Sequence, residues 1–191
     1  MRRRLVLLML IAVAGLVAAV AAWAGNPHFL RFQEPRLVDG GSFSGAAALT
    51  AAKAPSTAVL SDPRVLVADI VVVGIKEGVT TRLTAPFEAV YVCVNAGGHV
   101  PSAANKTTLV GNLETSAQFP AARNGKATGS LLTGPLPSSA EAAASTGFRC
   151  PSGQSLEFDQ VIFSGMVLSV DGGETVPLDT TLVSESVHGV S

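Results

Sequence analysis

Apolar runs and alternating segments dominate the chain after residue 60, and both patterns predict β-strands. Residues 65–75 form a run of mainly β-branched side chains, which is typical of a strand buried on both faces. Residues 87–94 predict a second strand, with Val92 on one side and Tyr91 and Cys93 on the other. The pattern leaves open which of these sides faces the core.

Residues 107–119 alternate between apolar and polar positions and predict a half-buried strand. Asn124 and Gly125 follow, a pair that accepts the positive φ angles of a type I′ turn. Residues 126–132 are therefore expected to return as the second strand of a hairpin. Within the first strand, one face carries Leu109, Leu113 and Phe119, and the other carries Asn112, Glu114 and Gln118.

Residues 155–169 predict a further strand, in which the alternation slips by one position. Phe158 and Val161 would fall on opposite faces of a regular strand, although both are apolar. A β-bulge at residues 159–160 accounts for the slip, because a bulge inserts one extra residue.

Weaker patterns fill the remaining stretches. Residues 171–173 (Asp-Gly-Gly) predict a turn, and residues 174–183 a strand that closes the sheet. Residues 29–38 and 42–49 are weaker strand candidates, and residues 46–54, rich in alanine, are the one possible helix. Two stretches are expected to be loops, the proline-containing residues 54–63 and the low-complexity residues 134–147.

Seven or eight strands with turns at regular spacing favour an all-β fold, a two-sheet antiparallel sandwich of immunoglobulin-like or similar type. Cys93 and Cys150 are expected to form one disulfide, because an even count of cysteines in an oxidising compartment favours pairing. Two buried free thiols are the alternative. The C-x-x-C spacing of a redox pair is absent.

The N-terminus has the three regions of a secretory signal: Arg2–Arg4, a run of 19 uncharged residues, and the small residues Ala22 and Ala24. A signal peptide over residues 1–24 is therefore predicted. The alternative is an uncleaved anchor, because residues 5–23 are just long enough to span a bilayer. Both interpretations place residues 25–191, expected to be a single domain, outside the cytoplasm.

The charge balance argues against a nucleic-acid partner. Three of the thirteen Lys and Arg residues lie in the expected signal, which leaves ten against fourteen Asp and Glu, a net charge of −4. These charges are scattered along the chain and form no basic stripe.

No group of residues forms a catalytic, metal or cofactor signature. Ser-His-Asp catalysis would need His28, His99 or His188 as its base, and two of these lie near the ends of the chain. Glu157 and Asp159 could serve as paired carboxylates, but alternating acids on a solvent face are the preferred interpretation.

Calcium and sugar binding are kept as alternatives. Asp171 and Glu174 flank a turn and could hold calcium with loop carbonyls, although a plain turn is preferred. Outside the expected signal, Tyr91 is the only Tyr or Trp, and sugar-binding sandwiches usually stack rings on these residues.

Two cysteine-centred segments carry a resemblance. The first is YVCVNAGGH at residues 91–99 with Pro101 and AANK at 103–106, and the second is FRCPSGQ at 148–154. Together they resemble a group of small exported proteins of actinobacterial type. The resemblance covers residues 65–183 and implies a signal peptide and a disulfide-linked β-sandwich. It implies no activity, cofactor or catalytic residue.

The sequence thus predicts a secreted or cell-surface module without enzymatic activity, which contacts another macromolecule or an envelope component. The polar loops that flank the expected disulfide, residues 95–106 and 134–147, are the predicted contact regions. A small secreted hydrolase or inhibitor is the second hypothesis, and a calcium- or carbohydrate-binding module is the third. The candidate contact residues are Asn95, His99, Asn105 and Lys106.

Overall fold

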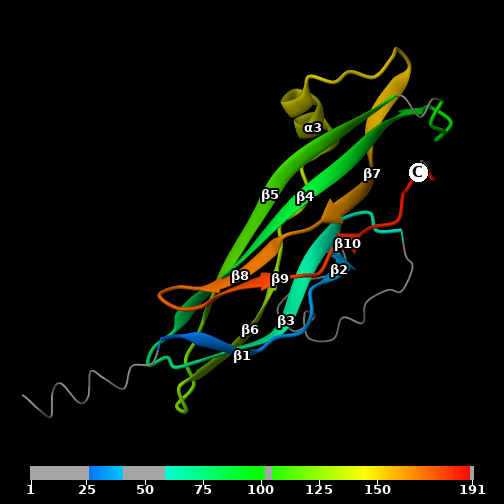
Figure 1. Cartoon of the computed structure of the whole chain (residues 1–191). Coiled ribbons are helices and arrows are strands. Elements are labelled where there is room, and N and C mark those ends of the chain that lie inside the picture. The colour runs from blue at the N-terminus through cyan, green and yellow to red at the C-terminus, as the bar shows by residue number, and fades with distance from the viewer. Residues whose placement is uncertain (1–25, 41–58, 102–104, 190–191) are drawn as a thin grey trace, which may run out of the picture.

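The chain folds as two antiparallel β-sheets packed face to face, as the sequence predicts (Figure 1). The computed structural model describes residues 26–40, 59–101 and 105–189. The expected signal or anchor, the strand candidate at 42–49 and the possible helix at 46–54 lie outside these ranges.

The described residues form ten strands rather than seven or eight, because three predicted strands each divide into two. The divided regions become β1 (His28–Arg31) and β2 (Arg36–Asp39), β7 (Gln154–Phe163) and β8 (Met166–Val170), and β9 (Thr175–Leu178) and β10 (Leu182–Val183).

The smaller sheet is built around β3 (Pro63–Val73). Strands β1 and β2 pair with successive stretches of one edge of β3, and β6 (Lys126–Leu132) pairs with the other edge. Strand β3 is buried on both faces, as its β-branched run predicts.

The larger sheet is built around β4 (Val79–Asn95), which is 17 residues long. Strand β5 (Lys106–Phe119) pairs along one edge of β4, and the other edge is shared by β7 and β8. Beyond these, β9 pairs with β8 and β10 pairs with β7.

Strand β4 extends eight residues before the predicted start, and it contains Pro86. A proline in a central strand removes a ladder hydrogen bond. Here the neighbouring strand is interrupted, because β7 ends at Phe163 and β8 begins at Met166. The carbonyl of Pro86 accepts a hydrogen bond from the N–H of Ser164 in this gap, so the proline lies where the ladder along this edge of β4 is already interrupted.

Two bulges keep the apolar side chains on the core face. In β7 the bulge lies at Asp159, because Tyr91 pairs with Phe158 and Val90 pairs with Gln160. This confirms the slip that the sequence predicts. In β3 an extra residue lies between Val67 and Ile70, and Asp69 there has a positive φ of 51°.

The predicted hairpin around Asn124–Gly125 is wrong. Strand β5 belongs to the larger sheet and β6 to the smaller one, so the chain crosses between the sheets after Pro120. A tight turn does form, with an isolated bridge between Ala121 and Ala127. Of the two central residues only Gly125 has a positive φ, of 72°, which is incompatible with type I′ geometry.

The predicted loop at residues 134–147 is also wrong in its second half, which forms the helix α3 (Ser139–Thr146). Ser138 caps the helix: its hydroxyl accepts a hydrogen bond from the N–H of Glu141, whose carboxylate accepts one from the N–H of Ser138. Gly147 ends the helix in the left-handed conformation, at a φ of 69°.

The main core lies between the two sheets, and α3 covers part of it. Tyr91 faces this core and is fully buried, and Val92 on the opposite side of β4 is equally buried. The strand therefore has no solvent face at this point. Ala142 of α3 joins the same core, where the helix contacts β5 and β7 (Figure 1).

Candidate functional site

The predicted disulfide is present at one end of the larger sheet. Cys93 lies near the end of β4, Cys150 lies in the segment that leads into β7, and their Cα atoms are 5.6 Å apart. The bridge thus joins neighbouring parts of the larger sheet rather than the two sheets. We call this end, made of residues 95–101, 105–106 and 134–153, the disulfide end; it is at the top of Figure 1.

Asn95 organises the first predicted contact segment. Its side-chain Oδ1 accepts hydrogen bonds from the N–H of Gly97 at 2.9 Å and of His99 at 3.1 Å. Its backbone N–H donates to the carbonyl of His99 at 2.9 Å. Residues 95–99 therefore form a closed turn that presents the exposed His99 to solvent.

Asn105 and Lys106 lie across the strand pair from this turn. The carbonyl of Asn105 accepts a 2.9 Å hydrogen bond from the N–H of Cys93, and Lys106 is opposite Val92 in the sheet. The structure thus brings all four predicted contact residues to the disulfide end.

Tyr91 fixes the segment before α3, a contact that the sequence did not predict. Its hydroxyl donates a hydrogen bond to the carbonyl of Pro137. Burial raises the pKa of this hydroxyl to about 12, and the carboxylate of Glu141 adds to the rise, because both disfavour the phenolate.

Glu141 and Ser138 form the second polar group at this end. The Ser138 hydroxyl donates a 2.7 Å hydrogen bond to Glu141 Oε2, and the Ser138 N–H donates another to the same oxygen. These two bonds lower the pKa of Glu141. The sequence did contain a signal for this pair, the S-x-x-E pattern of a capping box at residues 138–141.

A cavity of about 220 Å³ opens beside Tyr91. The carboxylate on its wall, Asp62, is paired with the guanidinium of Arg64, whose Nη2 lies 2.6 Å from Asp62 Oδ2. Paired in this way, Asp62 is a poor candidate for a catalytic base. The cavity is lined by Ser61, Asp62, Pro63, Tyr91, Leu136, Pro137, Ser138, Ser139 and Phe158.

The interpretation of Glu157 and Asp159 as acids on one solvent face is wrong for Asp159. The bulge turns Asp159 inward, and only 1% of its surface is exposed. Its Oδ1 accepts hydrogen bonds from the Ser186 hydroxyl at 2.6 Å and from the His188 N–H at 2.8 Å. Asp159 therefore anchors the segment after β10.

Glu174, one of the two residues considered for calcium binding, also has a structural contact. Glu174 Oε2 accepts a 2.7 Å hydrogen bond from the N–H of Phe29, and its own N–H donates to the carbonyl of Pro27. Glu174 thus fixes the start of β1 against the turn between β8 and β9.

Within the described ranges, no three His, Cys, Asp or Glu side chains are grouped so that they could hold a metal ion.

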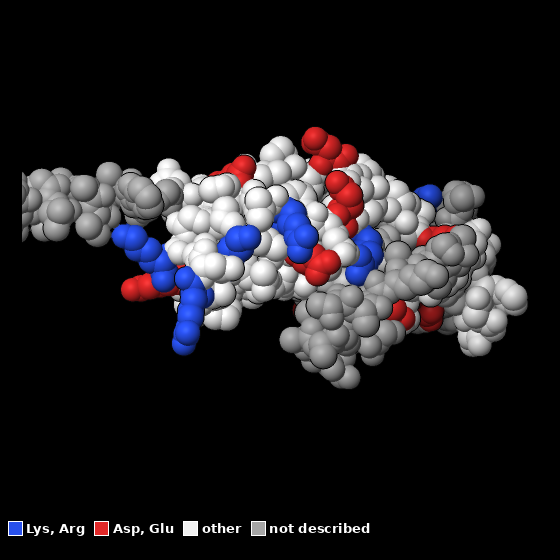
Figure 2. Space-filling view, turned by 90° about the horizontal axis from the view of Figure 1, so that it is seen from below, with Lys and Arg blue, Asp and Glu red and all other residues white. Residues whose placement is uncertain are grey.

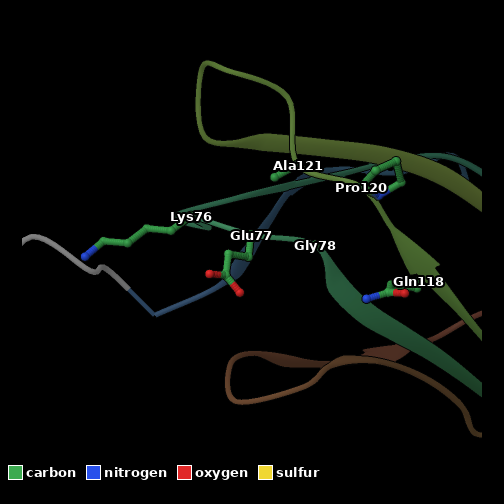
Figure 3. A pocket seen from close by; sticks show the side chains of 6 residues that line it. All are labelled: Lys76, Glu77, Gly78, Gln118, Pro120 and Ala121. Carbon is green, nitrogen blue, oxygen red and sulfur yellow. The ribbon is translucent and has the colours of Figure 1, made fainter.

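A hollow of about 380 Å³ lies at the opposite end of the sandwich, between the β3–β4 turn and the end of β5 (Figure 3). Figure 3 shows that Lys76, Glu77 and Gln118 extend in different directions and do not converge on one point. A hollow without convergent polar groups lacks the usual feature of a specific small-molecule site.

The charged side chains form no single-sign patch on the face shown in Figure 2, where acidic and basic groups are interspersed over a largely uncharged surface. The helix α3 is only eight residues long, and no helix in the described part of the chain could cross a bilayer.

No protein-family model matches this chain, and no curated protein matches it at a significant level.

Proposed function

We propose that the chain is an exported binding module that carries out no catalysis. In this proposal it works outside the cytoplasm, at the cell surface or as a secreted protein. Its disulfide end contacts another macromolecule or a component of the envelope.

One observation carries the proposal: both predicted contact segments lie at the end of the larger sheet where the Cys93–Cys150 bridge is (Figure 1). The Asn95 turn presents His99 on one side, and the capped helix α3 lies on the other. Exposed polar residues held by a rigid framework are typical of binding surfaces.

The geometry near the C-terminal segment argues against His188 as the base that the hydrolase hypothesis requires. Ser186 and His188 lie close to two carboxylates, but the Ser186 hydroxyl donates to Asp159. The imidazole Nε2 of His188 lies 3.5 Å from Glu157 Oε2. A catalytic triad instead requires the serine hydroxyl to donate to the histidine.

Export is supported by the disulfide and by the three-part N-terminus. Disulfides persist in oxidising compartments and are rare in the cytosol. The resemblance to small exported proteins of actinobacterial type points in the same direction.

Site-specific photo-crosslinking in the native host tests this function. A benzophenone amino acid replaces His99 or Arg149 at the disulfide end, or Arg123 in the turn at the opposite end as a matched control; all three positions are exposed. We expect one macromolecular adduct from positions 99 and 149 and none from position 123. An adduct that forms equally or only from position 123 overturns the proposal.

A further inference from the structure

Strand β5 has an edge that no other strand of the described ranges covers. It pairs with β4 in an unbroken register from Lys106 to Phe119, and β4 is its only partner strand there. The strand is 14 residues long. Proteins usually shorten, bend or block such an edge, yet β5 contains no proline and its register with β4 no bulge.

The register also determines which backbone groups face outward. The N–H of Cys93 donates to the carbonyl of Asn105. In an antiparallel pair this means that odd-numbered residues of β5 direct their N–H and C=O groups toward β4. The even-numbered residues direct theirs to the free edge, and the side chains of those from 106 to 118 are all exposed.

Val110 belongs to this even-numbered set and lies in the middle of residues 106–114. Its exposed fraction is 74%, the highest among the large hydrophobic residues that the structure describes. The side chains around it are polar, and Lys106 and Glu114 lie four positions to either side of it.

This strand is complementary to itself in one register. If two copies lie antiparallel with Val110 opposite Val110, Lys106 of each copy faces Glu114 of the other, and Thr108 faces Asn112. All of these are hydrogen-bonded pairs, because the outward groups belong to the even-numbered residues. Opposite charges directly across a strand pair are stabilising.

We propose that β5 is an interface through which two copies of this chain pair antiparallel about Val110, which joins their larger sheets into one. Glu114 has a competing contact in the single chain, with its Oε2 3.8 Å from Arg82 Nη1. Both side chains are about half exposed, so this contact contributes little and leaves Glu114 available.

This interface goes beyond the proposed function and uses a different surface, with only Lys106 in common. The crosslinking positions 99 and 149 lie outside the paired stretch 106–114. Failure of one proposal is therefore distinguishable from failure of the other.

A cysteine pair tests the register. In the purified exported chain, Val110→Cys places the two new Cα atoms about 5.5 Å apart across the dimer axis, a distance that a disulfide bridges. The matched control Asn112→Cys places them on the order of 14 Å apart along the strands. We expect a covalent dimer from Val110→Cys under mild oxidation and none from Asn112→Cys. Equal crosslinking of both variants contradicts the register.

Charge reversal tests the pairing by sedimentation. Lys106→Glu and Glu114→Lys each place two like-charge pairs across the axis and are expected to raise the dimer dissociation constant by about tenfold. The double variant restores opposite charges and is expected to restore dimerisation. Gln118→Lys, outside the paired stretch, is the control, and melting curves verify that each variant is folded. A chain that stays monomeric, or a double variant that fails to recover, overturns the proposal.

Discussion

Ser186 donates a 2.6 Å hydrogen bond to the buried carboxylate of Asp159, which fixes the segment after β10 to the bulge of β7. The N–H of Val187 donates to the carbonyl of the same aspartate at 2.9 Å. The bulge thus has two effects: it returns Val161 to the core face, and it turns a carboxylate inward to hold a neighbouring segment.

Replacing this carboxylate is expected to destabilise the fold. Asp159→Ala leaves the Ser186 hydroxyl and the His188 N–H without their acceptor, and should lower the free energy of unfolding by about 2–3 kcal/mol. Asp159→Asn, which keeps an oxygen acceptor, should cost less. Urea unfolding measures both. Glu157→Ala is the control, expected to change stability by at most about 0.5 kcal/mol, and an equal loss there would refute the anchoring role.

Removing the disulfide is expected to cost more than any of these side-chain changes. The bridge joins positions 57 residues apart, and the chain-entropy model assigns such a loop about 4 kcal/mol. The Cys93→Ala, Cys150→Ala double variant should show this loss in urea unfolding. Reduction of the unmodified chain is the control, and it should give a similar loss. A double variant as stable as the oxidised chain would contradict this contribution.

The hydroxyl of Tyr91 should make stability depend on pH in the alkaline range. Its pKa is raised from 10.0 to about 12 in the folded chain, so the folded state favours the neutral form. The resulting stabilisation is fully present below pH 10 and is lost as the pH rises toward 12. Tyr91→Phe should cost about 1 kcal/mol at pH 7 through the lost hydrogen bond to Pro137.

The test of Tyr91 is the difference in unfolding free energy between the unmodified chain and the Tyr91→Phe variant, measured from pH 8 to pH 12. The advantage of the unmodified chain should shrink above pH 10. A constant difference across the whole range would show that the hydroxyl does not titrate with a raised pKa.

Removing the N-cap of α3 should loosen the helix locally. Ser138→Ala is expected to destabilise the helix by about 1 kcal/mol, which should appear as faster amide hydrogen exchange over residues 139–146. Ser145→Ala, an exposed change within the same helix, is the matched control and should not speed exchange. Equal exchange in the two variants would contradict the capping role.

The Glu141 partner of this cap gives the helix a pH dependence of the opposite sign to that of Tyr91. Because the pKa of Glu141 is lowered, its carboxylate stabilises the cap fully at pH values above the ordinary pKa of a glutamate. This contribution is lost as the pH falls through the lowered pKa. Protection of α3 should therefore decline on acidification, and less so in the Ser138→Ala variant.

The parts of the fold that local pattern determines were predictable. The alternation in residues 107–119 matches the observed exposure of β5, and the slip after Phe158 located the bulge at Asp159. Each of these follows from which face of a strand a side chain occupies, and that depends only on neighbouring residues.

The parts that depend on partner strands were not predictable in the same way. Asn124–Gly125 correctly indicated a turn, but which sheet receives β6 is decided by β3, more than 50 residues earlier in the chain. The predicted strand begins only after Pro86, at residue 87, whereas β4 begins at Val79, and the gap between β7 and β8 makes the proline acceptable within it.

The candidate site likewise has features that local sequence predicts and features that depend on distant residues. The disulfide was predictable from the sequence, and the position of Asn95 beside it follows because Cys93 and Asn95 lie in one strand. The contact between Tyr91 and Pro137 joins positions 46 residues apart, and no local pattern predicts it. The capping box at Ser138 was a readable local signal inside a stretch interpreted as a loop.

Peptide mapping of the chain, expressed with its own N-terminus, tests the proposed export and the Cys93–Cys150 pairing together. This proposal predicts a non-reduced peptide in which Cys93 is joined to Cys150, recovered from the culture medium or the outer face of the envelope. Recovery of the chain from the cytoplasm, with both cysteines alkylated as free thiols, would contradict it.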